Sequence, residues 1–212
     1  VKSGKSNYPL KLVMGDDRLT RIVFVITGLD TGGAEMMLLK LCRTMDRHQF
    51  DPVVVSLGDK GTIGPLLEAQ GVTVYTLGMR AGRPSLGALL ILRRLIKDLA
   101  PNVIQGWMYH GNLAASLAGR GYSVVWGIRQ SLYDIGKERL LTRIVIKIGA
   151  ILSNSSAAII YNSQTSQEQH ARLGYSEIRS RCISNGFDVD VFKPDSSARI
   201  RLFQELGLPK TA

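Results

Sequence analysis

A glycine-rich loop follows the first β-type run of the chain and precedes a helical pattern. Gly28, Gly32 and Gly33 stand in GLDTGGAE, directly after the apolar residues 22–27. Glycine lets the backbone turn tightly and approach a ligand closely. A helix that begins there points unsatisfied N–H groups at the same place. The loop could therefore hold a phosphate or a hydroxyl group, or it could be a tight turn without a ligand.

Two common phosphate-binding motifs are excluded at this loop. The dinucleotide fingerprint G-x-G-x-x-G has a second glycine two residues after the first, where this chain has Asp30. The P-loop continues with lysine and then serine or threonine, but Gly33 is followed by Ala34 and Glu35. Glu35 is the nearest carboxylate to the loop, yet an acid in the first turn of a helix is favoured by the helix dipole anyway.

His110 is the histidine best placed for chemistry. It lies in VIQGWMYHGNLAA, just after a β-type run and before a helical pattern rich in small residues. A histidine there could accept or donate a proton near neutral pH, or it could cap or pack the helix. His48 and His170 stand in polar helical patterns, and we expect both at the surface.

The elements that must position these residues alternate along the chain. The first helical pattern places Ala34, Met37, Leu38, Leu41 and Met45 on one face. Strict alternation of strand and helix predicts βαβ units, and hence a doubly wound, Rossmann-like α/β domain with a parallel sheet. The β-type runs are residues 22–27, 53–57, 72–77, 103–105, 123–127, 157–161 and 181–184.

The strand ends predict where a ligand binds. In doubly wound sheets, ligands bind beyond the carboxyl ends of the strands. We therefore expect the site among four segments, which are residues 28–35, 107–112, 129–133 and 162–166.

Composition sets broad limits. The chain has 212 residues and a net charge of +10, and residues 80–147 hold eleven basic and three acidic side chains. Such a surface attracts nucleic acid, phospholipid headgroups or phosphorylated substrates, or it only aids solubility. No apolar run reaches the ~18–20 residues of a membrane span. Cys42 and Cys182 lie far apart in apolar contexts and are expected to be buried free thiols in a reducing compartment.

Residues 136–152 have an amphipathic pattern with helical period. Arg139, Arg143 and Lys147 share one side with Ile146, and the apolar residues on the other side are Leu141, Ile144, Val145, Ile148 and Leu152. An apolar residue flanked by cations suits a surface that meets lipid headgroups. The alternative is a core-facing helix with a solvated basic side.

Several segments, taken in order, resemble a known family. GLDTGGAE, GWMYHGNLAA, IIYNSQTSQEQHARLGY and CISNGFDVDVFKPD are similar to segments of the group 1 glycosyltransferases. These are retaining enzymes with the GT-B fold that use nucleotide sugars. The resemblance covers residues 21–208, and NGFD at residues 185–188 is its most specific element.

The resemblance implies a role for each candidate residue. In this family, one Rossmann-like domain holds the acceptor and a second binds most of the nucleotide sugar. His110 would lie beside the transferred sugar as the catalytic residue, while Gly32, Gly33, Asn112 and Arg129 would contact the donor or the acceptor. The donor would be a UDP-sugar and the acceptor a glycan or a lipid-linked molecule of polysaccharide, lipopolysaccharide or glycolipid synthesis. The sequence requires no metal and no other cofactor.

The resemblance also implies a division of the chain. Residues 21–186 would be the N-terminal acceptor domain, and 187–212 an interdomain linker with the truncated start of a donor domain. The sequence of residues 1–20 itself predicts a flexible or weakly ordered leader. One wall of the cleft cannot exclude water or orient the donor, so this part is expected to be inactive alone. We expect a cytoplasmic location, peripheral to the inner face of the membrane.

Three other functions compete with this interpretation. A non-catalytic basic module that docks on an anionic membrane or a partner explains the charge, but not the glycines and His110. A nicotinamide-dependent oxidoreductase predicts an acid at the end of the second strand, where Ser56 and Leu57 stand. Nucleic-acid binding is disfavoured because the aromatic residues are not interleaved with the basic ones.

Overall fold

The computed structural model describes residues 19–80 and 85–207. The predicted leader therefore lies outside the described residues, apart from its last two positions. Each β-type run of the sequence forms a strand. The strands are β1 (Thr20–Ile26), β2 (Phe50–Ser56), β3 (Thr73–Thr76), β4 (Val103–Trp107), β5 (Ser123–Ile128), β6 (Ala158–Tyr161) and β7 (Ser180–Cys182).

Helices follow the strands in turn. Two of them begin at serine caps, because the Ser85 hydroxyl accepts from the N–H of Ala88 and the Ser163 hydroxyl accepts from the N–H of Ser166. The helices are α1 (Gly33–Thr44), α2 (Ile63–Glu68), α3 (Leu86–Leu99), α4 (Met108–Ala118), α5 (Leu140–Leu152), α6 (Gln164–Arg172) and α7 (Ala198–Glu205).

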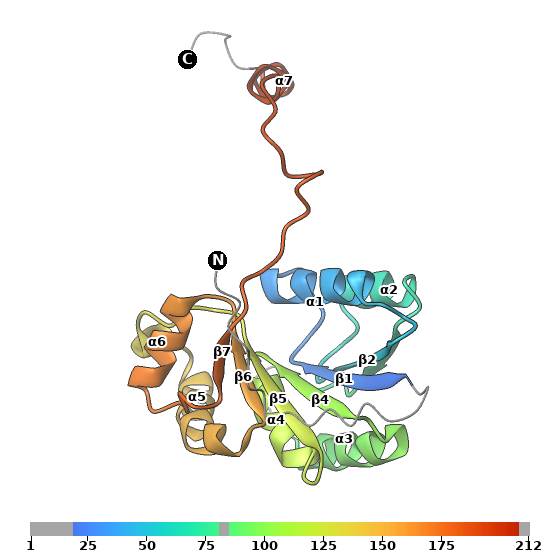
Figure 1. Ribbon diagram of the computed structural model, residues 1–212, viewed down its shortest axis with the longest axis vertical. Coiled ribbons are helices and arrows are strands. Elements are labelled where there is room, and N and C mark those ends of the chain that lie inside the picture. Colours follow the sequence, from blue (N-terminus) through green and yellow to red (C-terminus); the bar gives the residue numbers. More distant parts are fainter. Residues whose placement is uncertain (1–18, 81–84, 208–212) are drawn as a thin grey trace, which may run out of the picture.

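The strands form one seven-stranded sheet in the order β3-β2-β1-β4-β5-β6-β7, and every pair is parallel. Strands β2 and β3 extend the sheet on one side of β1, and strands β4 to β7 extend it on the other side. Helices α1 and α2 cover one face of the sheet, and α3 and α4 cover the opposite face (Figure 1). The predicted doubly wound α/β fold is confirmed.

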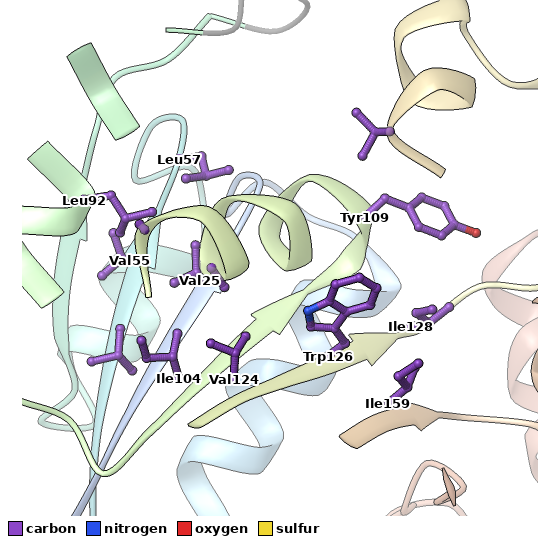
Figure 2. Close-up of a cluster of buried hydrophobic side chains, with 14 of the residues drawn as sticks. Val25, Val55, Leu57, Leu92, Ile104, Tyr109, Val124, Trp126, Ile128 and Ile159 are labelled. Atoms are coloured by element: carbon purple, nitrogen blue, oxygen red, sulfur yellow. The ribbon is translucent and has the colours of Figure 1, made fainter. Parts of the chain in front are cut away.

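The sheet separates two apolar cores. Along β1, Val23 and Val25 belong to the core beneath α3, α4 and α5, whereas Phe24 and Ile26 belong to the core beneath α1 and α2. Figure 2 shows part of the first core, where Val25 and Trp126 lie close to α4. A strand that is buried on both faces needs a continuous apolar run, which is the pattern the sequence shows at β1.

The chain leaves the sheet after β7. An extended stretch leads to α7, which lies apart from the sheet and its helices (Figure 1) and has no buried residue. Two aromatic side chains of this stretch, Phe187 and Phe192, are largely exposed, and the Lys40 ammonium lies 5.7 Å and 5.4 Å from their ring centres. The assignment of residues 187–212 to a linker and a second domain stays a prediction.

Candidate functional site

A pocket of about 380 Å³ opens at the carboxyl ends of the strands. It lies where β1 and β4 adjoin, which is the point at which the winding of the sheet reverses. In doubly wound folds this reversal leaves a crevice that binds ligands. The pocket is lined by Gly33, Ala34, Glu35, Met37, Met108, Arg129, Gln130 and Asn185.

The first turn of α1 forms one wall of the pocket. Gly32 is the N-cap in an extended conformation, and among the described residues no side-chain cap hydrogen bond forms at this helix end. A Cβ on Gly33 would meet no atom within 4 Å, and the φ of Gly33 is not positive. The backbone conformation at position 33 therefore does not require glycine. The missing side chain leaves open space over the helix N-terminus. A Cβ on Gly32, in contrast, would collide with the carboxylate of Glu35.

Arg129 also lines the pocket. Its guanidinium lies 4.4 Å from the ring centre of Trp107, and its Nη1 donates to Asn185 Oδ1 over 3.4 Å. The buried Nε has no hydrogen-bond partner, and the ion pairs of the described residues do not include Arg129. Burial lowers the pKa of Arg129, but arginine stays protonated in proteins. Within the described residues this half-buried positive charge thus forms no ion pair, although Glu35 also lines the pocket.

The stacked indole fixes the position of this charge. Trp107 is 1% exposed, and its Nε1–H donates to the carbonyl of Ala34 in the first turn of α1 over 3.0 Å. The ring is therefore tied to the first turn of α1 while it supports the guanidinium of Arg129. A cation on the face of an indole is attracted by the π-system.

Helix α6 holds the loop that carries Arg129. The Asn162 amide donates to the Arg129 carbonyl over 3.1 Å, and the Ser166 hydroxyl donates to the Gln130 carbonyl over 2.7 Å. The N–H of Leu132 donates to Gln169 Oε1 over 2.6 Å. The expected ligand-binding segment 162–166 thus supports the pocket wall, and it does not line the pocket.

Met108 joins β4 to α4 in an unusual conformation. Its φ of 65° places a non-glycine residue in the left-handed region. Such a conformation costs on the order of 1 kcal/mol or more and is often found at functional sites. It brings Met108 to the pocket while the following residues begin the helix.

His110 lies in the first turn of α4, where the sequence placed it. Its side chain is half-buried, and burial lowers its pKa, so the imidazole is neutral near pH 7. It does not line the pocket of the described residues, and no hydrogen bond of its side chain is formed there. Its catalytic role stays a prediction.

Asn112 is held in the interior. It is 3% exposed, its Oδ1 accepts from the N–H of Gly127 over 3.2 Å, and its Nδ2 donates to the Gly127 carbonyl over 3.4 Å. Gly106 adds to this contact, because a Cβ there would lie 2.5 Å from the Asn112 Cα. The Asn112 amide thus joins α4 to β5, and the predicted ligand contact of Asn112 stays a prediction.

Two expectations about single residues are wrong. His170 was expected at the surface, but it is completely buried, while His48 is exposed as expected. Cys42 is the buried thiol that we expected, whereas Cys182 is exposed. Polar residues surround His170 in the sequence, so helical periodicity could not reveal that tertiary contacts bury it.

The amphipathic helix α5 turns a different face to the core than predicted. Ile146, expected beside the cations, is fully buried, and Ile144 and Ile148 are 45% and 38% exposed. The close approach of Tyr175 to Gly149 explains this orientation, because a Cβ on Gly149 would lie 2.5 Å from the Tyr175 hydroxyl. The exposed stripe of α5 is defined by Leu140, Ile144, Ile148 and Ile151.

The basic residues of α5 lie beside this stripe. Arg139 and Lys147 are exposed and Arg143 is half-buried. No helix of the described ranges is long and apolar enough to cross a membrane. In the same ranges, no three His, Cys, Asp or Glu side chains gather where they could hold a metal ion.

Sequence reasoning missed several pocket residues. Asn185 was quoted only for its resemblance to a family segment, although it follows the last strand and so fits the rule of strand ends. Gln130 lay within a segment that we expected at the site. Met108 gave no signal as a residue type, because its contribution comes from its backbone conformation.

Comparisons with known proteins give a family and structures of similar fold. The sequence profile described as Glycosyltransferase Family 4 matches residues 31–191. Alr3699/HepE of Anabaena in complex with UDP has a TM-score of 0.70 and 22% identity, covering 88% of this chain and 50% of that chain. The same protein is known in complex with UDP-glucose. No curated protein matches the chain significantly.

Two further structures are similar at lower identity. A glycosyltransferase from Rickettsia africae has a TM-score of 0.67 and 12% identity, covering 91% of this chain and 51% of that chain. The lipopolysaccharide outer core galactosyltransferase WaaB has a TM-score of 0.59 and 12% identity, covering 80% and 46%. At these identities the likeness is one of fold. The chain spans about half the length of the structures it matches.

Proposed function

Because the chain belongs to glycosyltransferase family 4, we propose that it takes part in moving a sugar from a UDP-sugar to a glycan or a lipid-linked acceptor. The proposal includes retention of the anomeric configuration and a role in polysaccharide, lipopolysaccharide or glycolipid synthesis. The UDP and UDP-glucose complexes of the similar Anabaena protein support the choice of nucleotide.

The charge of Arg129 in the same pocket as the first turn of α1 is the observation that carries the proposal. A diphosphate needs positive charge and N–H donors at close range, and both are present at the pocket. The open space over Gly33 leaves room for the phosphate oxygens to approach the backbone. An unpaired, half-buried cation that has no structural ion pair is best explained by an anionic ligand.

The chemistry at this site would follow from charge stabilisation. In a retaining transfer, the bond from the anomeric carbon to the diphosphate breaks, and the acceptor oxygen bonds to that carbon on the same face. The acceptor proton passes to a diphosphate oxygen. Arg129 and the N–H groups of α1 would stabilise the charge that develops on the leaving diphosphate. His110, neutral because of its burial, would hydrogen-bond the sugar.

Turnover would require more than this chain. The structures that it matches are about twice as long, and a cleft needs two walls to exclude water and orient the donor. We therefore expect the 212-residue chain to bind UDP without transferring a sugar. A chain extended by a second half is expected to transfer.

Calorimetric titration of the 212-residue chain tests the pocket. UDP should bind, uridine should bind at least about tenfold more weakly, and Arg129→Gln should lose about tenfold in UDP affinity, which is about 1.4 kcal/mol. Arg120→Gln is the matched control, because Arg120 is an exposed cation beyond the opposite end of α4. Equal loss in both variants, or equal affinity for UDP and uridine, would refute a diphosphate site.

The exposed stripe of α5 supports a second proposal, that the protein docks peripherally on the cytoplasmic face of a membrane. Leu140 and Ile151 are 70% and 78% exposed and lie beside the exposed cations Arg139 and Lys147. Each cation near an anionic surface contributes about 1 kcal/mol, screened by salt. Binding to anionic vesicles that falls with added salt is expected. Equal binding to neutral vesicles, or no binding to either, would contradict it.

A further inference from the structure

His170 is a buried, polar side chain that the pocket itself does not use. It is 0% exposed, and the rings of Tyr109, Tyr161 and Tyr175 surround it at centre distances of 5.7, 5.4 and 5.0 Å. Its Nδ1 lies 2.7 Å from the Ser166 carbonyl, and its Nε2 lies 2.8 Å from the Tyr109 hydroxyl. A histidine that only fills space does not need both contacts.

The partners of His170 determine its tautomer. A backbone carbonyl can only accept, so Nδ1 carries the proton and donates to Ser166. In the neutral ring Nε2 must then accept, and the Tyr109 hydroxyl donates to it. The imidazole therefore receives one hydrogen bond from α4 and gives one to the Ser166 carbonyl, four residues earlier in its own helix α6, and neither bond can be reversed without a change of protonation.

These two bonds, together with the Ser166 hydroxyl, connect two segments that line the pocket. Tyr109 follows Met108 in the first turn of α4, and Met108 lines the pocket. Ser166 donates through its hydroxyl to the carbonyl of Gln130, which lines the pocket beside Arg129. The start of α4 is thus bonded to His170, and the loop after β5 is bonded to Ser166 of the same helix, so that α6 connects the two.

We propose that His170 is a positioning residue that fixes the first turn of α4 and the loop after β5 relative to each other, so that Met108 and Arg129 keep the pocket in shape for its ligand. The inference rests on the proposed function for the identity of that ligand, a nucleoside diphosphate. Its structural part concerns only contacts within this chain.

The alternative is that His170 contributes only to packing, and Tyr175 provides the matched control. Tyr175 contacts the same imidazole, but its hydroxyl donates to the Ile146 carbonyl of α5 over 3.0 Å. Loss of that hydroxyl disturbs the same core without touching the two hydrogen bonds of His170. Tyr109→Phe removes the hydroxyl that donates to His170 and keeps the ring, and His170→Leu removes both bonds of the imidazole.

The experiment compares Tyr109→Phe, His170→Leu and Tyr175→Phe in the 212-residue chain by hydrogen exchange and UDP calorimetry. Exchange in peptides covering residues 106–113 and 128–133 should become faster in the first two variants and stay unchanged in Tyr175→Phe. UDP affinity should fall on the order of tenfold in the first two and less than about twofold in the control.

The outcomes separate the inference from the proposed function. If the parent chain does not bind UDP, the proposed diphosphate site at this pocket fails, and the exchange data still decide the role of His170. Unchanged exchange in Tyr109→Phe overturns the inference. So do equal effects in Tyr109→Phe and Tyr175→Phe, which would show a general loss of packing. Should His170→Leu fail to fold, Tyr109→Phe carries the test alone.

Discussion

Replacing Gly33 by valine tests whether a ligand occupies the space over this residue. The change should lower ligand affinity and leave the stability of the fold nearly unchanged. A Cβ on Gly33 meets no atom within 4 Å, and its φ is not positive, so the Cβ of a valine there meets neither a clash nor a forbidden backbone. In a helix, valine is about 0.4 kcal/mol more favourable than glycine. The free energy of unfolding should therefore change by less than about 0.5 kcal/mol, which is a melting shift of at most ~2 °C.

The effect on binding should be much larger. A phosphate oxygen that accepts from the first N–H groups of α1 must come within ~3 Å of the backbone, where the valine methyl groups would stand. Losing one hydrogen bond to a charged group costs about 1.5–3 kcal/mol, or roughly 10- to 100-fold in affinity. Gly33→Ala should show a smaller loss, because it adds a single methyl group.

Calorimetry of UDP binding and of thermal unfolding checks this prediction. Gly106→Ala is the opposite control, because its Cβ would lie 2.5 Å from the Asn112 Cα and 2.8 Å from the Asn112 nitrogen. It should lose about 1–3 kcal/mol of stability and keep its UDP affinity while folded. If Gly33→Val unfolds the chain, or keeps full UDP affinity, the space over Gly33 does not receive a ligand.

Three further outcomes are expected. In a chain that includes the second half, His110→Ala should lower turnover by about 10²–10⁴-fold with an unchanged melting temperature. Near-normal turnover would show that His110 serves only in packing. Burial lowers the pKa of His110 and of His170 below the ordinary 6.5. As the pH falls, these two histidines are therefore protonated in the unfolded chain at a higher pH than in the folded one. Stability in urea should therefore fall as the pH drops from 7.5 through 6.5 to 5.5, and less steeply in His170→Leu; a flat profile would contradict this. Asn112→Ala should lower the free energy of unfolding by about 1–3 kcal/mol, because the N–H of Gly127 loses its hydrogen-bond partner. An unchanged urea midpoint would show that this contact adds nothing to stability.

The fold could be predicted from the sequence because its signal is local and repeated. The central strands β1, β2 and β5 are β-branched or apolar runs, and parallel strands buried on both faces require that pattern. The rule of strand ends then placed the segments of Gly33 and Arg129 at the correct edge of the sheet. Both residues line the pocket.

The rest of the site depends on contacts that no local pattern encodes. Asn112 stands at the binding edge, but the backbone of Gly127 occupies its amide. His170 is polar among polar neighbours and is buried by the rings of three tyrosines. The exposed face of α5 was misplaced because one close contact at Gly149 fixes the rotation of the helix, and helical periodicity cannot supply that rotation.

The guanidinium over Trp107 gives the protein an internal optical probe. The chain contains two tryptophans, both 1% exposed, and only Trp107 has a cation on its ring face within the described ranges. A ligand that draws Arg129 toward its own charge changes the electric field across that indole, and with it the wavelength and intensity of emission. In a Trp126→Phe background the emission of Trp107 alone would report pocket occupancy in real time, without a label.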